Sequence, residues 1–209
     1  MNANESMRVA VFGGTFDPPH YGHIHVITAL LNSDLVDEIW LVPTGEDHKD
    51  RAVSAADRKA MIECVVECEY GPRYRVNPVK VNCCQLDGSL GDSSTWNLLN
   101  HLQNQYPSYE FKFVTGVDLI DQLSSWKKAE DLIHKFRFIA VERLGCITPS
   151  CIPPYVELLR TGSNVSFGIS SSQLRESLYS GKCVVGLIPS CVLAYIEKQE
   201  LYRQKRELN

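Results

Sequence analysis

Two histidines at the start of a predicted helix are the first candidates for chemistry in this chain. His20 and His23 follow a glycine pair, Gly13 and Gly14, and the turn formed by residues 17–19, Asp-Pro-Pro. Apolar residues then recur at helical spacing and predict a helix over residues 21–31. Two histidines on one helical turn could bind a metal ion or could simply face solvent. The pair alone therefore does not decide the chemistry.

The residues before the histidines favour a phosphate site. Residues 9–12 form an apolar run that ends at the glycine pair, which predicts a short buried strand. Neither Gly13 nor Gly14 carries a Cβ, so the backbone there can approach a ligand closely. The expected order is strand, glycine-rich turn and helix N-terminus. Free backbone N–H groups and the positive end of a helix dipole suit a phosphate at such a place.

A second candidate phosphate site lies near the other end of the chain. Ile169 is followed by Ser170, Ser171 and Ser172, and Arg175 comes one helical turn later. A serine run before a helix is a good N-cap, and an arginine in the first turn often faces solvent. Three hydroxyls and free N–H groups beside a guanidinium also form a phosphate cradle.

The two motifs together resemble a known family. The phrase Gly13-Gly14-Thr15-Phe16-Asp17-Pro18-Pro19-His20-Tyr21-Gly22-His23 resembles the signature of the nucleotidyltransferase superfamily that carries a His-x-Gly-His motif. Within that superfamily the sequence of this motif is most similar to that of the nicotinamide/nicotinate mononucleotide adenylyltransferases. The run from Ile169 to Arg175 resembles their Ile-Ser-Ser-(Ser/Thr)-x-x-Arg motif. Both motifs occur in the family's order, and the similarity extends over nearly the whole chain.

The resemblance implies roles for particular residues. It implies that His20 and His23 contact the ATP phosphates and stabilise the transition state, and that Lys49 and Arg175 neutralise the charge that develops on the leaving pyrophosphate. It assigns nucleotide binding to Gly13, Gly14, Thr15, Phe16, Gly116, Asp118, Ile169, Ser170, Ser171 and Ser172. In the acceptor site it implies that Trp126 stacks on a pyridine ring and that Arg143 ends a neighbouring strand. Arg58 is expected to be structural or to link its helix to the loop that carries Lys49.

One segment departs from the family pattern. Bacterial relatives read Tyr-Thr-x-Asp-Thr-Leu where residues 93–98 of this chain read Ser-Ser-Thr-Trp-Asn-Leu. That segment helps to recognise the substituent of the pyridine ring. Thr95, Trp96 and Asn97 are therefore expected to replace the usual contacts, and the Asn97 amide, which both donates and accepts, favours acceptance of both nicotinamide and nicotinate.

The activity implied by the resemblance is adenylyl transfer in NAD biosynthesis, from ATP to nicotinate or nicotinamide mononucleotide with release of pyrophosphate. ATP is the co-substrate, and Mg²⁺ is expected to be carried by its phosphates, since no acidic cluster is visible in the sequence. Phosphopantetheine adenylyltransferase and cytidylyltransferase remain the alternatives within the superfamily, and a nucleotide-binding regulator without catalysis is the alternative outside it. An NAD-dependent oxidoreductase is disfavoured because no Gly-x-Gly-x-x-Gly motif follows the first strand.

Composition agrees with a small-molecule enzyme. The chain has 209 residues and a net charge of −4, so no broad basic face favours nucleic acid. No apolar run approaches the roughly 20 residues of a membrane span. The start of the chain lacks the apolar core of a signal peptide, which predicts a cytoplasmic protein, with the nucleus also open. The eight cysteines lack Cys-x-x-Cys spacing and are expected to be reduced thiols. The sequence is compatible with a homo-oligomer.

The pattern of elements predicts an α/β fold. Strands are expected at residues 9–12, 37–43, 74–81, 111–115 and 138–141, and helices at 21–31, 54–67, 95–105, 119–123, 126–136, 170–179 and 189–199. This alternation predicts a Rossmann-like, doubly wound parallel sheet with helices on both faces, of nucleotidyltransferase type. Residues 1–6 are expected to be a disordered lead-in and residues 7–209 one domain, whose helical part 170–203 carries the second phosphate motif. Segment 145–154 reads as a surface connector.

Overall fold

The central feature of the fold is a parallel sheet that is wound in both directions from its middle. The computed structural model describes residues 6–43, 52–71, 80–83, 94–142, 148–160 and 168–203. Within these residues six strands pair in the order β3-β2-β1-β4-β5-β6, and every pairing is parallel. The strands are β1 (Met7–Gly14), β2 (Glu38–Pro43), β3 (Lys80–Cys83), β4 (Tyr109–Gly116), β5 (Arg137–Val141) and β6 (Val156–Leu159). The predicted fold class is confirmed.

Helices cover both faces of this sheet because successive strand residues point in opposite directions. Val9 and Val11 face a core shared with α3 (Thr95–Gln105), the 3₁₀ helix η3 (Val117–Ser125) and α4 (Ala129–Lys135). Ala10 and Phe12 face a second core, to which α1 (Tyr21–Leu31) and α2 (Ala55–Tyr70) contribute. Strands buried on both faces read as continuous apolar runs, as the sequence of β1 does.

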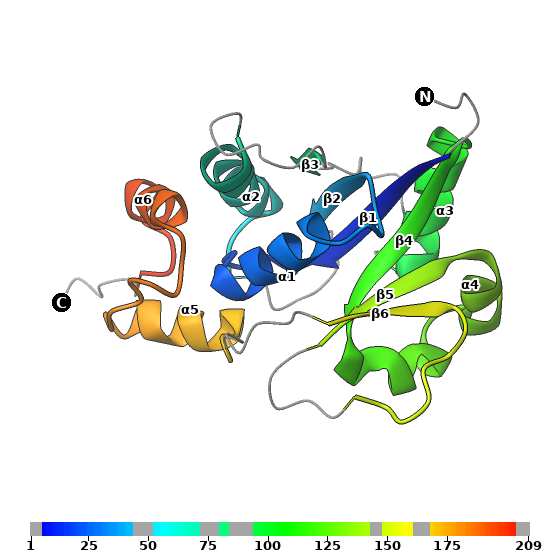
Figure 1. The fold of residues 1–209 in the computed structure, drawn as a ribbon. Coiled ribbons are helices and arrows are strands. Elements are labelled where there is room, and N and C mark those ends of the chain that lie inside the picture. Colours follow the sequence, from blue (N-terminus) through cyan, green and yellow to red (C-terminus); the bar gives the residue numbers. More distant parts are fainter. Residues whose placement is uncertain are drawn as a thin grey trace.

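The C-terminal helices form a third apolar cluster beside the sheet. Helices α5 (Ser171–Tyr179) and α6 (Ser190–Lys198) lie on the side of α2, away from α3 and α4 (Figure 1). The cluster joins residues of α2, α5 and α6 to Tyr202, near the end of the described chain. This packing brings the second sequence motif to the N-terminal end of α1.

Serine side chains cap three of the helices, as the sequence predicts for α2 and α5. The Oγ atoms of Ser54, Ser94 and Ser170 accept hydrogen bonds from the backbone N–H groups three residues later, at 3.1, 3.4 and 3.3 Å. Each cap satisfies one of the helix's unpaired donors, for about 0.5–2 kcal/mol.

The structure shortens one predicted helix and adds one strand that was not predicted. The sequence predicted a helix over residues 126–136, but Trp126 is extended (φ −74°, ψ 157°) and Lys128 is left-handed (φ 52°), so α4 begins at Ala129. A left-handed residue cannot continue a right-handed helix. Strand β6 was not predicted at all. It has four residues, follows a proline pair and pairs with β5 alone among the described strands.

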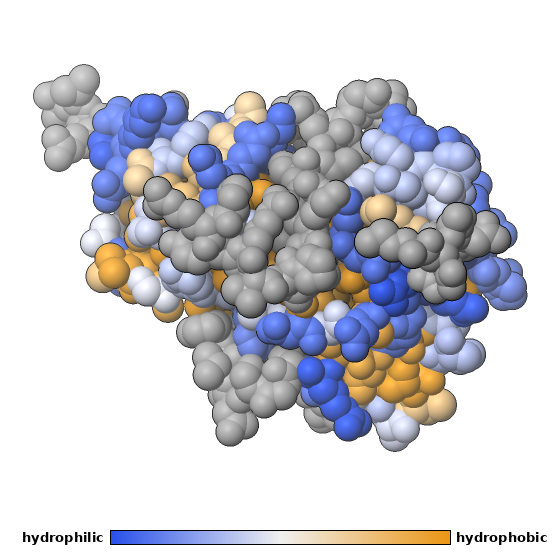
Figure 2. Space-filling view, turned by 45° about the horizontal axis from the view of Figure 1, so that its top comes forward, coloured by the Kyte–Doolittle hydropathy of each residue, from blue (hydrophilic) through white to orange (hydrophobic). Residues whose placement is uncertain are grey.

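The remaining expectations fall partly outside the described residues. Of the strand predicted at residues 74–81, only residues 80 and 81 are described, and both belong to β3. Most of the predicted lead-in, residues 1–5, is not described. On the face drawn in Figure 2, hydrophilic residues predominate among the coloured residues, and hydrophobic residues show in several separate areas. No helix in the described ranges is long and apolar enough to span a bilayer.

Candidate active site

The candidate site lies where the sheet changes its direction of winding. β1 and β4 are adjacent, and their chains cross over to opposite sides, toward β2 and β5 respectively. In open α/β sheets, ligands bind at such a point, beyond the carboxyl ends of the strands. A cavity of about 180 Å³ lies there. It is lined by Phe12, Gly13, Val26, Phe113, Val114, Thr115, Gly116, Leu119, Trp126 and Val141.

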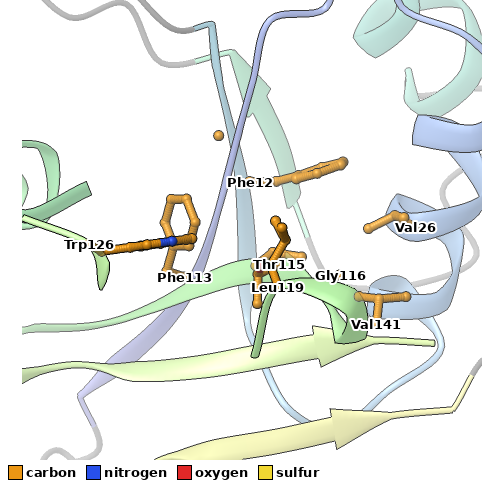
Figure 3. Close-up of a pocket in the computed structure, with 10 residues that line it drawn as sticks. Phe12, Val26, Phe113, Thr115, Gly116, Leu119, Trp126 and Val141 are labelled. Carbon is orange, nitrogen blue, oxygen red and sulfur yellow. The ribbon is translucent and has the colours of Figure 1, made fainter. Parts of the chain in front are cut away.

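The walls of this cavity are mostly apolar. Figure 3 shows Trp126 and Phe113 at one end and Val26 and Val141 at the other. Trp126 is half-buried, and its ring meets Phe113 edge-on at 5.8 Å. Gly13 belongs here for a steric reason, because a Cβ at this position would lie 3.2 Å from the Phe113 ring. A flat apolar ligand fits such walls.

The two histidines are held by reciprocal hydrogen bonds at the start of α1. His20 is the N-cap, and its Nδ1 accepts from the backbone N–H of Gly22 at 3.1 Å. The Nδ1 of His23 accepts from the backbone N–H of His20 at 3.2 Å, and the two ring centroids are 3.8 Å apart. Because each Nδ1 is an acceptor, a neutral ring carries its proton on Nε2. Both rings are therefore oriented as Nε2–H donors.

Phe16 packs against the ring of His23 and so buttresses the histidine pair. It is 1% exposed and lies in the left-handed region (φ 48°), which costs a bulky residue about 1–3 kcal/mol. Its ring packs 4.8 Å from that of His23 and 5.5 Å from that of Phe12. A Cβ on Gly14 would lie 3.2 Å from the Phe16 ring. A side chain at Gly14 would thus crowd the aromatic packing around His23.

The two sequence motifs, far apart in the chain, are in direct contact. The Ser171 hydroxyl donates to the Pro18 carbonyl at 3.0 Å, and Arg175 Nη1 donates to the Asp17 carbonyl at 2.8 Å. Arg175 Nη2 also donates to Ser172 Oγ at 3.1 Å. The N-termini of α1 and α5 therefore meet, which places two sets of backbone N–H groups and a guanidinium at one mouth.

Two buried polar residues near this mouth were not predicted as part of the site. Asp17 had been treated as a turn residue, yet its carboxylate is 1% exposed and accepts from the Tyr202 hydroxyl at 2.6 Å. No sequence pattern marks Tyr202, which lies 185 residues from Asp17. Arg58 is fully buried and its Nη1 donates to the Thr15 carbonyl at 3.2 Å, so it joins α2 to the turn after β1.

Other predicted residues are not part of the cavity wall. Thr95, Trp96 and Asn97 form the first turn of α3. Trp96 packs edge-on against Phe136 at 6.4 Å, with Lys128 Nζ 5.1 Å above its ring. Asp118 is exposed in the first turn of η3. Lys49 and Arg143 lie outside the described residues.

The cysteines and the acidic residues form no metal site in the described part of the chain, where no three His, Cys, Asp or Glu side chains are grouped to hold an ion. Cys64, Cys68, Cys151, Cys183 and Cys191 are free thiols. Burial raises the pKa of Cys191 to about 12. That thiol is therefore protonated at neutral pH.

Gly22 tests whether the placement of His20 matters. A Cβ there would lie 2.9 Å from Cε1 and Nδ1 of the His20 ring, so Gly22→Ala must displace that ring. We expect kcat to fall roughly 10- to 100-fold, because a catalytic group misplaced by about 1 Å costs this much. Alanine favours a helix over glycine by about 1 kcal/mol, which offsets the roughly 0.5–2 kcal/mol lost if the displaced His20 ring no longer caps α1, so the melting temperature should change by only a few degrees. The measurements are steady-state kinetics and thermal unfolding.

Gly168→Ala is the matched control for this change. Among the residues that the structure describes, no atom lies within 4 Å of a Cβ added to Gly168 once its chain neighbours are set aside, and Gly168 is also close to the second motif. Its kcat should stay within about twofold of wild type, since open space accepts a methyl group without rearrangement. Wild-type kcat in Gly22→Ala would show that the His20 ring position does not limit turnover.

Comparison with known proteins agrees with this geometry. Residues 11–177 match the family described as cytidylyltransferase-like. A protein of Leifsonia xyli named "Probable nicotinate-nucleotide adenylyltransferase" is 34% identical over 198 residues, covering 94% of each chain. A Salinibacter ruber protein of the same name is 32% identical over 200 residues, covering 94% of this chain and 98% of its own.

A solved structure extends the match to three dimensions. The nicotinic acid mononucleotide adenylyltransferase of Plasmodium falciparum, complexed with NaAD, superimposes with a TM-score of 0.76. It is 25% identical and covers 94% of this chain and 97% of its own. With the two sequence motifs in contact and the 3-2-1-4-5-6 sheet, these matches show that the chain belongs to the cytidylyltransferase-like family, within its group of nicotinate-nucleotide adenylyltransferases.

Proposed function

We propose that this protein transfers the adenylyl group of ATP to the 5′-phosphate of nicotinate mononucleotide, forming deamido-NAD and pyrophosphate in NAD biosynthesis. The observation that carries the proposal is the meeting of the two motifs. His20 and His23 at the start of α1 lie against the start of α5 with its Arg175, at the edge of an apolar cavity. The names of the relatives support the choice of acceptor.

The reaction needs little covalent help from the protein. A phosphate oxygen of the mononucleotide bonds to the α-phosphorus of ATP, the bond from that phosphorus to the bridging oxygen breaks, and pyrophosphate leaves with the electron pair. The attacking phosphate is ionised at neutral pH, so no general base is required. Catalysis then rests on positioning and on donors aimed at the developing charge. The Nε2–H groups of His20 and His23 are the donors that we assign to this role.

We assign the leaving pyrophosphate to the second motif. The N-terminus of α5 presents the backbone N–H groups of its first turn, and Ser170, Ser171 and Ser172 lie there. In this structure the Ser170 and Ser171 hydroxyls donate to Gln173 Oε1 and to the Pro18 carbonyl, so each would exchange that partner for a phosphate oxygen. Arg175 is 22% exposed at its side chain and reaches the same mouth. Lys49, which the described residues do not include, is proposed to add a second positive charge.

ATP phosphates are proposed to bring Mg²⁺ with them. The side chains at this mouth suit an ion that arrives on the phosphates, since His20, His23 and Arg175 offer nitrogen donors for phosphate oxygens and not the oxygen ligands that Mg²⁺ prefers. When bound, Mg²⁺ would neutralise phosphate charge and help to orient the triphosphate. The protein's own donors at α1 and α5 would then contact phosphate oxygens that the ion leaves open.

The pyridine ring of the acceptor is proposed to bind in the switch-point cavity against Trp126. The apolar walls formed by Phe113, Leu119 and Val26 exclude water from a flat ring. The phosphate end would then point toward His20 and His23. Arg143 and the segment with Thr95, Trp96 and Asn97 are proposed to contact the acceptor, with that segment choosing between the acid and the amide.

The decisive experiment compares acceptors. Pyrophosphate release and dinucleotide formation are measured with ATP and nicotinate mononucleotide, nicotinamide mononucleotide or 4′-phosphopantetheine, and with CTP in place of ATP. We expect the highest kcat/KM with ATP and a pyridine mononucleotide. Turnover confined to phosphopantetheine or to CTP would contradict the proposed acceptor, and absence of turnover with every pair would contradict catalysis.

A further inference from the structure

The carboxylate of Asp17 is held by a partner from the far end of the chain. The side chain is 1% exposed, and a buried carboxylate requires hydrogen-bond partners. Tyr202 donates its hydroxyl to Oδ1 at 2.6 Å, and the backbone N–H of Ala52 donates to Oδ2 at 3.0 Å. Arg175 Nη1 lies 4.0 Å from Oδ2. Tyr202 therefore supports one oxygen while the other faces α2 and α5.

The backbone of Tyr202 is strained, which indicates that its position has a specific role. It lies in the left-handed region (φ 55°), where a bulky residue is strained, and it is 4% exposed. The surrounding apolar cluster of α2, α5 and α6, and the edge of the Tyr179 ring at 6.3 Å, hold it there. Burial and the hydrogen bond to Asp17 raise the pKa of Tyr202 above its usual range. Its hydroxyl therefore stays protonated at neutral pH and can donate a hydrogen bond.

Asp17 lies at the junction of the two phosphate motifs. Its backbone carbonyl accepts from Arg175, and the carbonyl of the next residue, Pro18, accepts from Ser171. His20, the N-cap of α1, follows Pro18 by two positions. A shift of the Asp17 backbone would therefore move Arg175 and His20 relative to each other. The acceptor cavity would be spared, because neither Asp17 nor Tyr202 lines it.

We propose that Tyr202 is a positioning residue for the ATP phosphates, and that it acts by fixing Asp17 between the two motifs. The inference rests on the proposed function, since it needs ATP at this mouth. It predicts a selective effect. Loss of the hydroxyl weakens the binding of ATP and leaves the binding of the mononucleotide unchanged.

The test is Tyr202→Phe, which removes the hydroxyl and keeps the ring. We expect the KM for ATP to rise about 3- to 10-fold, the range of one lost hydrogen bond, and the KM for nicotinate mononucleotide to stay within about twofold. Isothermal titration with a non-hydrolysable ATP analogue should show the same weakening without turnover. Circular dichroism confirms that the variant is folded.

Tyr195→Phe is the matched control. The Tyr195 hydroxyl, on α6, donates to Asp57 Oδ1 at 3.0 Å, so this variant also loses a tyrosine–aspartate hydrogen bond within the same cluster. It should leave the KM for ATP unchanged. If both variants raise it equally, the effect is general loosening of the C-terminal helices, and the positioning role is wrong.

A second variant approaches the contact from its other side. Asp17→Asn removes the charge and one acceptor, and it should also raise the KM for ATP more than that for the acceptor. An unchanged KM for ATP in folded Tyr202→Phe or Asp17→Asn would overturn the inference. A wild-type protein without adenylyl transfer would instead contradict the proposed function, so the two failures are distinguishable.

Discussion

A folded His23→Ala variant is expected to lose at least about two orders of magnitude in kcat with ATP and nicotinate mononucleotide. The reason is the orientation of the ring, because its Nδ1 accepts from the backbone N–H of His20 and a neutral ring then carries its proton on Nε2. Removal of one oriented donor to developing charge costs about 3 kcal/mol. Single-turnover kinetics under saturating substrates measure the loss directly. A kcat near that of wild type would contradict the assignment.

His20 requires a more careful substitution, because it has two roles. Its ring caps α1 by accepting from Gly22, so His20→Ala removes both the cap and the Nε2–H donor. Loss of a cap alone lowers the free energy of unfolding by about 0.5–2 kcal/mol. His20→Asn restores a cap without the imidazole donor. We expect Asn to recover stability in thermal unfolding but not kcat, and recovery of both would show that His20 is only a cap.

Trp126→Ala is expected to weaken both pyridine acceptors to a similar extent. Stacking on a flat ring does not distinguish an acid from an amide, and by analogy with base–aromatic stacking it is worth about 1–3 kcal/mol. The value of kcat/KM should therefore fall roughly 5- to 150-fold for nicotinate and nicotinamide mononucleotide alike. The KM for ATP should hardly change. Kinetics with each acceptor in turn give the result.

Trp126→Phe is the control, since it keeps an aromatic ring beside Phe113 and Phe138. Trp126→Phe should keep most of the kcat/KM that Trp126→Ala loses. Trp126 is also packed against the core, so thermal unfolding must accompany the kinetics. If Trp126→Ala lowers the melting temperature and leaves kcat/KM unchanged for both acceptors, the tryptophan is a core residue and the pyridine site lies elsewhere.

The sequence was sufficient for the features that depend on local chemistry. The apolar run of residues 9–12, the glycine pair and the start of α1 are local patterns. Strand β1 covers the run but extends from Met7 to Gly14 and includes both glycines, and α1 begins at Tyr21 as expected. The serine caps of α2 and α5 are also local, because a cap joins a hydroxyl to an N–H three residues away. The regular alternation of strands and helices leaves few topologies, and the doubly wound sheet is one of them.

Only the tertiary structure decided which residues share the site. Strand β6 is short and carries no strong pattern, so its pairing with β5, and not its own sequence, makes it a strand. The left-handed Lys128 moves Trp126 out of the predicted helix and leaves it at the cavity wall. The first turn of α3, predicted to contact the acceptor, lies outside that wall.

The contact between Asp17 and Tyr202 shows the physical reason most clearly. It joins residues 185 positions apart, and no local pattern can carry information about a partner at that distance. An aspartate before two prolines predicts a turn, and a tyrosine after the last helix has no predicted partner in the fold. Their roles follow from burial, because a carboxylate removed from water must find a donor, and the packing of α2, α5 and α6 places the Tyr202 hydroxyl there.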